Sequence, residues 1–486
     1  MVFSGLTFLL YFLPVTLALY FIRPSIKWRN GVLLVASLLF YAWGEPLWIL
    51  AMVASALVNW ACAAVISSSD DPKVKKAFLA IGVVFAGALL FACKYSTFFA
   101  NSFLSLVGAT ALLKGVALPI GISFYTFQII SYTVDVYREE VKAQKSFACL
   151  LLYVSCFPQL IAGPIVRYGD VAKQIKTRHT APDDFSQGTI RFAVGLAKKA
   201  LVANVCAKII EQLPMAGAGA LSLAGAWYAA FVYMLQVYFD FSGYSDMAIG
   251  LGRILGFRYR ENFDHPLISL SAAEFWRRWH ISLGDWFREY LMYPIMRTGW
   301  VRKLSMKKSA KHGRLFYRNL ATILVTMIVW TFTGMWHGAN WCLLLWGEYY
   351  GIIIVLEKFV FGKILAKTPK PVRWLLNFIV AVVSFVIFYY TDVGDVGTHL
   401  GAMLGFGSGL IDAATRDVMR TYSVLPLIFF ILALPVNEWL LKLFKRLKLS
   451  PRLWNISRAA LAVAGALLAL VFIEGMSSNP FIYFQF

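Results

Sequence analysis

The stretch that decides the fold is Phe332-Thr-Gly-Met-Trp-His-Gly-Ala-Asn-Trp341. An apolar run from Leu320 to Trp330 leads into it, and a second from Trp341 to Leu356 leaves it. The whole chain of 486 residues shares this character, because 59% of its residues are hydrophobic and only 15% are charged. This composition excludes an ordinary soluble enzyme and predicts an all-α polytopic membrane protein.

Within that stretch, Gly334 and Gly338 bracket Trp336-His337, and Asn340 is suited to cap a following helix. The pattern predicts an imidazole at a break between two apolar helices. A polar break in lipid is tolerated against protein or beside a water-filled cavity, so a titratable residue there indicates a functional site. Histidine also takes and returns protons near neutral pH. The structural alternative is a histidine at the membrane interface, bonded to a loop carbonyl.

Apolar segments of about spanning length recur along the chain and predict about 11–13 transmembrane helices. They lie at about 5–22, 31–43, 47–66, 77–93, 117–136, 193–212, 227–250, 319–335, 340–357, 374–391, 423–441 and 457–475. A further apolar piece, 146–166, has basic residues on both sides, and Pro158 and Gly163-Pro164 interrupt it. We expect that piece to be re-entrant.

The net charge of +21 is concentrated in loops between apolar segments. The run 297–318 contains eight Lys and Arg residues and no acid, and Lys358 to Arg373 and Lys442 to Arg452 are similar. All these loops fall on one side when the N-terminus is outside, and the positive-inside rule makes that side cytoplasmic. Twelve spans return the C-terminus to the outside. Nucleic-acid binding is therefore not needed to explain the charge.

Residues 251–318 form a long cytoplasmic excursion in which aromatic residues alternate with Arg and acids, which predicts amphipathic interfacial helices. On such a helix Trp276, Trp279 and His280 share one face, and Arg277 and Arg278 point elsewhere. The alternative for most of these residues is an aromatic belt with snorkelling arginines.

Two acids, Asp240 and Asp246, lie inside an apolar span, where ionised groups are costly. With Ser242, Tyr244 and Ser245 they form a polar stripe, for which the functional interpretation is the wall of a reaction tunnel. The structural alternative is capping and packing of a helix kinked at Gly243.

The sequence has no Gly-x-Ser-x-Gly elbow and no Gly-x-x-x-x-Gly-Lys-Ser/Thr loop, so it carries no signature of serine hydrolysis or NTP chemistry. Its six cysteines form no C-x-x-C pair and stand at no metal-ligand spacing with His, so no metal is expected. A covalent intermediate on Cys342 or Ser123 stays open, although no base stands beside either in sequence.

Five stretches together resemble the bacterial membrane-bound O-acyltransferases, in the alginate O-acetyltransferase branch of that superfamily. They are Phe157–Arg167, Phe239–Gly250, Ala273–Pro294, Phe332–Trp341 and the terminal Phe481–Phe486. The resemblance implies one integral-membrane domain over 1–486, with N-terminal spans 1–136, a catalytic core 137–357 and C-terminal spans 358–486. Its helices are expected to surround a central tunnel, with re-entrant and interfacial helices among them.

The resemblance also implies that His337 is the catalytic histidine and His280 its partner position. The candidate tunnel- or substrate-lining residues are Trp336, Trp341, Asn340, Trp276, Trp279, Asp240, Ser242, Tyr244, Asp246, Gln159 and Arg167. The candidate donor-side basic residues are Arg277, Arg278 and Arg288.

The expected activity is transfer of an acyl group, acetyl by resemblance, from a cytoplasmic thioester to a hydroxyl group outside. The donor is acetyl-CoA or a phosphopantetheinyl carrier protein, and no permanently bound cofactor is expected. The acceptor is a cell-envelope polysaccharide, or a secreted SGNH-type acyltransferase that passes the group on, and the location is the bacterial inner membrane. D-alanyl transfer toward teichoic acid is the nearest alternative. A flippase, or a scaffold subunit of an export complex, is the alternative of another class.

Overall fold

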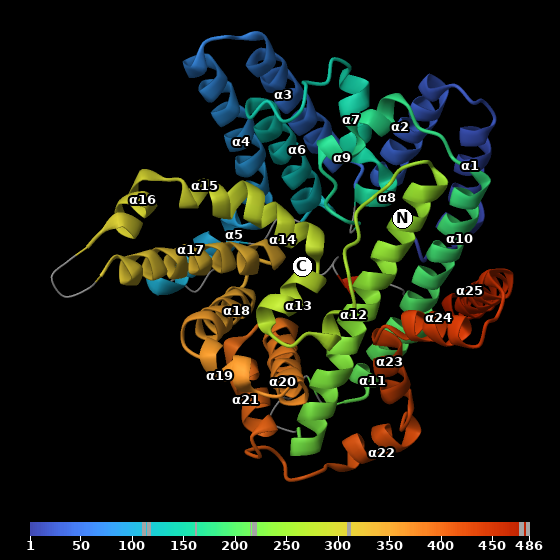
Figure 1. Ribbon diagram of the computed structural model, residues 1–486, viewed down its shortest axis with the longest axis vertical. Helices are drawn as coiled ribbons and strands as arrows, with labels where there is room; N and C mark the ends of the chain where they lie inside the picture. The colour runs from blue at the N-terminus through green and yellow to red at the C-terminus, as the bar shows by residue number, and fades with distance from the viewer. Residues whose placement is uncertain are drawn as a thin grey trace. The chain divides into compact units, whose positions relative to one another are not determined.

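The computed structural model consists almost wholly of helices (Figure 1). It describes residues 1–486 except 109–112, 114–117, 161–162, 214, 216–220, 309–312, 476–480 and 483–486. Over these described residues, β structure is limited to one isolated bridge between Phe263 and Trp279. The all-α class expected from the composition is therefore confirmed.

The chain divides into two compact units. The first contains Met1–Ala200, Gly243–Glu261 and Ala459–Gln485. Its helical elements are η1 (Phe8–Phe12), α1 (Leu13–Phe21), α2 (Ile26–Ala42), α3 (Trp48–Ser68), α4 (Pro72–Lys94), α5 (Ser96–Leu106), α6 (Ile122–Tyr137), α7 (Phe147–Ser155), α8 (Phe157–Leu160), α9 (Tyr168–Lys176) and α10 (Pro182–Ala197). Three elements belong partly to each unit: η2 (Lys198–Ala203), α12 (Leu223–Ile254) and α25 (Pro451–Glu474).

The second unit contains Leu201–Ser242 and Asn262–Arg458. Its helical elements are α11 (Asn204–Glu211), η4 (Pro266–Ile268), α13 (Ala272–Arg278), α14 (Ile281–Phe287), η5 (Arg288–Met292), α15 (Tyr293–Met296), α16 (Gly299–Met306), α17 (Arg314–His337), α18 (Trp341–Phe359), α19 (Gly362–Lys367), α20 (Lys370–Tyr389), α21 (Val393–Met403), α22 (Ala413–Thr421), α23 (Leu425–Ala433) and α24 (Val436–Arg446).

Five helices in the described part of the chain are long and apolar enough to cross a membrane: α3, α4, α17, α20 and α25. The pair α23 and α24 makes a sixth if it is one broken span. The chain is therefore a multi-pass membrane protein. The other predicted spans are also helical, but they are shorter, are interrupted, or, like α12 and α18, carry acidic and aromatic residues among the apolar ones.

The structure adds three details to the predicted elements. The segment 423–441 is two helices bent by 72°, with Pro435 at the bend, because proline lacks the N–H that would continue the first helix. At Gly243, where the structural alternative placed a kinked helix, α12 continues without interruption from Leu223 to Ile254. In the predicted re-entrant piece the first helix ends at Ser155, shortly before Pro158, and the chain is again non-helical at Gly163-Pro164, so interruptions lie close to both expected positions.

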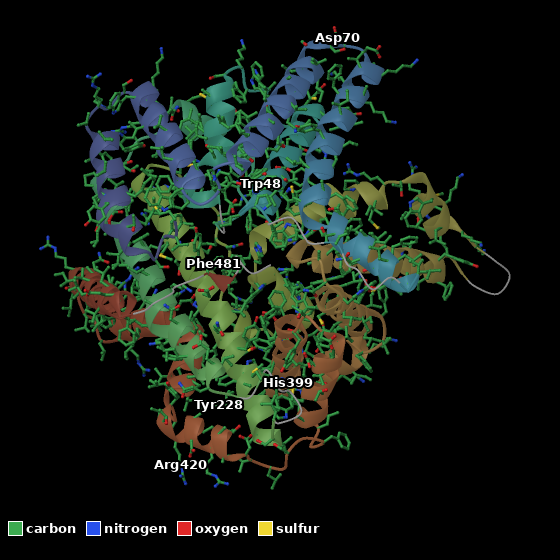
Figure 2. All side chains as sticks on the ribbon, turned by 180° about the vertical axis from the view of Figure 1, so that it is seen from behind. Trp48, Asp70, Tyr228, His399, Arg420 and Phe481 are labelled. Carbon is green, nitrogen blue, oxygen red and sulfur yellow. The ribbon has the colours of Figure 1, made fainter. Side chains whose placement is uncertain are left out.

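In the first unit, α3 and α4 form an antiparallel pair joined by a turn at Asp70, labelled in Figure 2. Asp71 caps α4 by accepting a hydrogen bond from the Lys73 backbone N–H at 2.8 Å. On α3, buried Asn59 accepts a hydrogen bond at 2.8 Å from Thr133 on α6, so a polar contact links these two apolar helices. Such interhelical hydrogen bonds stabilise membrane helices by about 1 kcal/mol.

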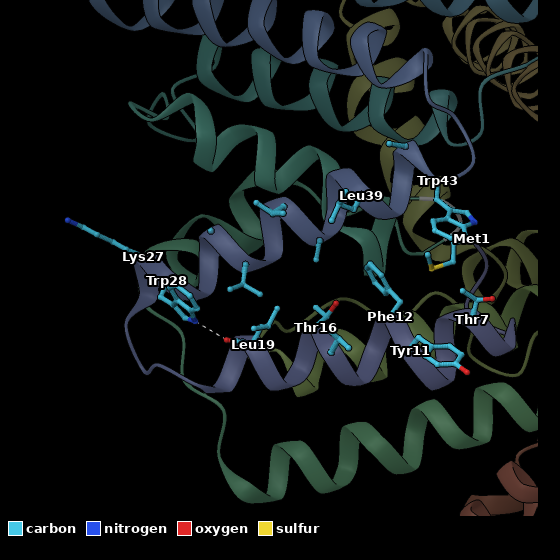
Figure 3. Close-up of a pocket in the computed structure, with 16 residues that line it drawn as sticks. Met1, Thr7, Tyr11, Phe12, Thr16, Leu19, Lys27, Trp28, Leu39 and Trp43 are labelled. Carbon is cyan, nitrogen blue, oxygen red and sulfur yellow. Dashed lines mark hydrogen bonds between the residues drawn. The ribbon is translucent and has the colours of Figure 1, made fainter.

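An apolar groove of about 980 Å³ lies between α1 and α2 in the same unit (Figure 3). Its walls include Phe12, Leu19 and Leu39, and Lys27 and Trp43 lie toward its two ends. The groove is entirely within the first unit and includes no residue that the sequence marks for chemistry.

In the second unit, α17 and α18 form a hairpin whose helices approach closely (Figure 1). A Cβ added at Gly334 would collide with the carbonyl oxygen of Leu343, and one added at Gly347 would collide with that of Trp330. Small residues permit this close packing in membranes. Gly334 therefore serves helix packing inside α17, and the prediction that it opens the break was wrong.

Candidate active site

His337 is the last residue of α17. The break that follows is short, because α18 begins at Trp341 and Asn340 caps it by accepting a hydrogen bond from the Leu343 N–H at 2.8 Å. This is the cap expected from the sequence. The imidazole is 2% exposed, so the turn between two tightly packed helices holds it inside the unit.

Aromatic rings surround the His337 imidazole. The ring centroids of Trp336, Trp346 and Phe388 lie 4.9, 4.8 and 5.4 Å from its own, each in an edge-to-face arrangement. Aromatic pairs of this geometry add to the stability gained by burial alone. The imidazole is thus held in a packed apolar environment, where an electrostatic interaction is stronger than in water.

His280 does not lie on the helix predicted for it. Helix α13 ends at Arg278, Trp279 is extended and pairs with Phe263, and His280 has φ 45° and ψ 52°. The face shared by Trp276, Trp279 and His280 was therefore a wrong prediction. The backbone pairing of Trp279 with Phe263 ends helix α13. His280, in the left-handed region, then starts α14 in a new direction.

A buried asparagine orients His280. The Oδ1 of Asn262 lies 3.2 Å from His280 Nδ1, and it also accepts hydrogen bonds from the hydroxyl and backbone N–H of Ser282 at 2.8 and 3.2 Å. An amide oxygen only accepts, so we assign the proton to Nδ1 of the imidazole. His280 is fully buried, and desolvation lowers its pKa to about 3. The ring is therefore neutral at physiological pH. Asn262 was missed because its distance in sequence from His280 matches no motif.

Both histidines contact the indole ring of Trp336. The Trp336 ring lies 5.7 Å from the His280 ring and 4.9 Å from the His337 ring, measured between centroids. Phe241 of α12 covers another side of His280 at 4.6 Å. Three segments remote in sequence thus build one buried cluster in the second unit. Phe241, Trp346 and Phe388 were not predicted, because each looks like any other aromatic residue of an apolar span.

The other aromatic candidates have different roles. Trp276 is partly buried and packs against Trp330, Trp346 and Tyr350, whereas Trp279 is buried and packs against Phe275 and Phe385. Trp341, at the start of α18, is 52% exposed and does not share the burial of the two histidines.

The polar stripe of α12 is divided between the units. Asp240 and Ser242 are each 2% exposed in the second unit. Asp246, in the first, forms ion pairs with Arg191 at 2.9 Å and Lys198 at 2.7 Å, which gives its charge a structural role. Tyr244 lies 4.6 Å from both Phe3 and Phe481, measured between ring centroids, within the first unit.

The remaining lining candidates also belong to the first unit. Gln159 is buried and donates a hydrogen bond to the carbonyl of Tyr153. Arg167 begins α9, where its backbone N–H donates to Asp170 at 3.3 Å. Both residues have contacts that organise their own segment.

Two of the three basic candidates are engaged in ion pairs. Arg278 pairs with Glu274 at 3.1 Å and Asp264 at 2.8 Å, and Arg288 pairs with Asp285 at 3.0 Å. Arg277 is exposed. Among the described residues, no group of three or more His, Cys, Asp or Glu side chains is arranged to hold a metal ion.

A third buried histidine provides a contrast. His399, labelled in Figure 2, has Nδ1 2.9 Å from the Tyr390 hydroxyl and Nε2 3.0 Å from the carbonyl oxygen of Ala226. That carbonyl can only accept, so Nε2 donates to it and Nδ1 accepts from Tyr390. Both nitrogens thereby join α21 to its neighbours, as in a structural histidine.

Several known proteins are similar in sequence to this chain. The model of the MBOAT, membrane-bound O-acyltransferase, family matches residues 6–393. A probable alginate O-acetylase of Pseudomonas putida is 35% identical over 100% of both chains. A peptidoglycan O-acetyltransferase of Helicobacter pylori is 31% identical over 83% of this chain and 80% of its own, and a teichoic acid D-alanyltransferase of Bacillus subtilis is 28% identical over 53% and 62%. The chain belongs to the membrane-bound O-acyltransferase family and is an acyltransferase.

Proposed function

We propose that this acyltransferase moves an acetyl group from a cytoplasmic thioester, across the membrane, to a hydroxyl group outside. The observation that carries the proposal is the cluster in which His337 and His280 both contact Trp336. We further propose that 1–486 is one integral-membrane domain with this cluster in its catalytic core.

In the proposed reaction His337 is the general base. It accepts the proton of the attacking hydroxyl while the hydroxyl oxygen forms a bond to the thioester carbonyl carbon. The tetrahedral intermediate collapses, the carbon–sulfur bond breaks, and the imidazolium returns the proton to the departing thiolate. Such proton transfer contributes about 10²–10⁴-fold to the rate. No serine or cysteine of the enzyme is acylated.

His280 is proposed to position the reacting groups. Its Nδ1–H donates a hydrogen bond to Asn262 Oδ1, and with a pKa of about 3 the ring stays neutral through catalysis. A neutral imidazole with Nδ1–H presents Nε2 as a hydrogen-bond acceptor. His280 is therefore suited to orient a hydroxyl or a neighbouring donor, and it is unsuited to serve as the acid.

The proposed orientation of the chain in the membrane rests on the charge of its loops. Arg302, Lys303, Lys307 and Lys308 lie in or directly after α16, and Arg314 begins α17. The positive-inside rule places that end of α17 in the cytoplasm and its His337 end toward the outside, with both chain termini outside. The bacterial inner membrane is the proposed location. The exposed Arg277 and the 297–318 run would attract the phosphates of CoA or an acidic carrier protein.

The acetyl group is proposed because the relatives that align with most of the chain are named for O-acetylation. The acceptor would be a cell-envelope polysaccharide, or a secreted SGNH-type acyltransferase that completes the transfer. D-alanyl transfer from a carrier protein is the second candidate, favoured by the D-alanyltransferase that matches about half of the chain.

The test uses purified protein in proteoliposomes sorted by orientation. Acetyl-CoA, acetylated carrier protein and D-alanylated carrier protein, each with a labelled acyl group, are supplied on the cytoplasmic face, and polysaccharide is supplied on the other. The proposal expects labelled acetyl ester on the outer polysaccharide. Labelled D-alanyl ester alone would support the second candidate. No acyl transfer from any donor, with or without a secreted partner, would contradict both.

Donor affinity that does not change between low and physiological salt would remove the steering role of the basic run, because exposed charges are screened over about 10 Å at 0.1 M.

A further inference from the structure

One indole N–H beside His337 has no structural use. Trp346 is 3% exposed, and its ring lies 4.8 Å from the His337 ring, measured between centroids. Among the described residues, no hydrogen-bond acceptor lies within reach of Trp346 Nε1. Buried donors in proteins are nearly always satisfied, so one left without an acceptor calls for a ligand or another functional explanation.

Several neighbouring polar groups of the same unit do have hydrogen-bond partners. The hydroxyl of Tyr350, which packs on Trp346, bonds to Ser384 at 2.9 Å. The indoles of Trp227 and Trp374 donate to the carbonyls of Met403 and Leu267 at 3.0 and 2.9 Å. The indoles of this unit therefore fall into two groups: those of Trp227 and Trp374 donate to backbone carbonyls, whereas the Nε1–H groups of Trp276 and Trp346 have no acceptor within reach among the described residues. Of these two rings, Trp346 is the one whose contact with the proposed base is at 4.8 Å between centroids.

We propose that Trp346 is a further catalytic residue, whose Nε1–H donates a hydrogen bond to the thioester carbonyl oxygen. This inference rests on the proposed role of His337. The reacting carbonyl must lie near the imidazole that serves the hydroxyl, and Trp346 shares a ring contact with that imidazole. A fixed donor in a dry, low-dielectric site stabilises developing negative charge far better than one in water.

The Trp346 N–H acts at one step of the reaction, the formation of the tetrahedral intermediate. When the hydroxyl oxygen bonds to the carbonyl carbon, the carbonyl π electrons move to oxygen, and Trp346 hydrogen-bonds the resulting oxyanion. On collapse those electrons re-form the carbonyl as the thiolate leaves. The indole keeps its proton throughout, and the proton that moves is the one His337 carries from hydroxyl to sulfur. The hydrogen bond is stronger to the oxyanion than to the thioester, so it lowers the barrier more than it aids binding.

The experiment replaces the indole N–H and keeps the ring. Trp346→Phe is measured beside Trp227→Phe, which removes an N–H that is bonded to a backbone carbonyl, and both are assayed for kcat, for KM of the donor and for thermal unfolding. The proposal expects Trp346→Phe to lose about 100-fold in kcat, by analogy with loss of one oxyanion donor, with KM little changed. Trp227→Phe should lower unfolding temperature and leave kcat near the parent value.

Two outcomes would overturn the proposal: Trp346→Phe that keeps kcat within a few-fold of the parent, or a kcat loss accompanied by an equal loss of folded protein. If Trp346→Phe fails to fold, 3-benzothienylalanine at position 346 substitutes sulfur for the N–H at nearly the same shape and gives the same two alternatives. His337→Ala is assayed in parallel. If it stays active, the base assignment fails, whereas an inactive His337→Ala beside a fully active Trp346→Phe overturns only the oxyanion assignment.

Discussion

Asn262→Asp is the substitution that most sharply examines the histidine pair. Asn262 is 1% exposed, and its Oδ1 is 3.2 Å from His280 Nδ1. The aspartate keeps an acceptor oxygen in nearly the same place, so the hydrogen bonds from Ser282 are preserved. What changes is the charge beside an imidazole whose pKa burial has lowered to about 3.

The magnitude follows from the distance. Two unit charges 4 Å apart interact by about 4 kcal/mol at an effective dielectric constant of about 20, which is about three pKa units. A neighbouring carboxylate favours the imidazolium, so the His280 pKa should rise from about 3 to roughly 6. The ring would then be neutral at pH 8 and protonated as the pH falls through roughly 6. Activity that needs neutral His280 should disappear in that range.

The assay is the pH dependence of kcat between pH 5 and 8, for the parent, Asn262→Asp and Ser282→Ala. Ser282→Ala removes a hydrogen bond to the same oxygen without adding charge, so its profile should keep the shape of the parent profile. Asn262→Asp should match the parent at pH 8 and lose activity at a higher pH on the acidic side. An Asn262→Asp profile that coincides with the parent profile would refute the requirement for a neutral His280.

Three further predictions concern the hairpin, the second histidine and the topology. Gly347→Ala should destabilise the protein by about 1–3 kcal/mol, because its Cβ meets the Trp330 carbonyl; Gly397→Ala, on α21 with nothing near the added Cβ, should be neutral or stabilising, and equal unfolding temperatures for the two would contradict the tight packing. His280→Ala should lower kcat less than His337→Ala does, because it removes a positioning group, and kinetics with the reverse order would exchange the two roles. A cysteine at Ala339 in a cysteine-free protein should react with a membrane-impermeant thiol reagent on intact cells, and reaction that requires broken membranes would reverse the topology.

The patterns that could be read from sequence were those set by local chemistry. Long apolar runs can form only helices in lipid, and Asn340 capped α18 as its side chain allows. The helix ends that depended on tertiary contacts were not readable. Gly334 marks close packing against Leu343, and Pro435 bends a segment whose composition alone indicates one span.

In the candidate site, too, some residues could be predicted from the sequence and others could not. His337 could be selected because its imidazole stands at a break between two apolar runs, and the resemblance to the family implied a role for both His337 and His280. Asn262, Trp346 and Phe388 could not, since their importance comes only from their positions beside an imidazole. In Asp246 the sequence signal was real, but it reflected ion pairs with Arg191 and Lys198, two residues that lie far from it along the chain.

The central claim, that His337 is the general base of acyl transfer, is tested most directly by the kcat of His337→Ala. The variant is compared with His179→Ala, which alters an exposed histidine, after both are shown to accumulate in the membrane as the parent does. The account predicts that His337→Ala retains less than about 1% of the parent kcat, because a general base contributes at least about 10²-fold, and that His179→Ala is unaffected. A His337→Ala variant with more than about a tenth of the parent activity would contradict it.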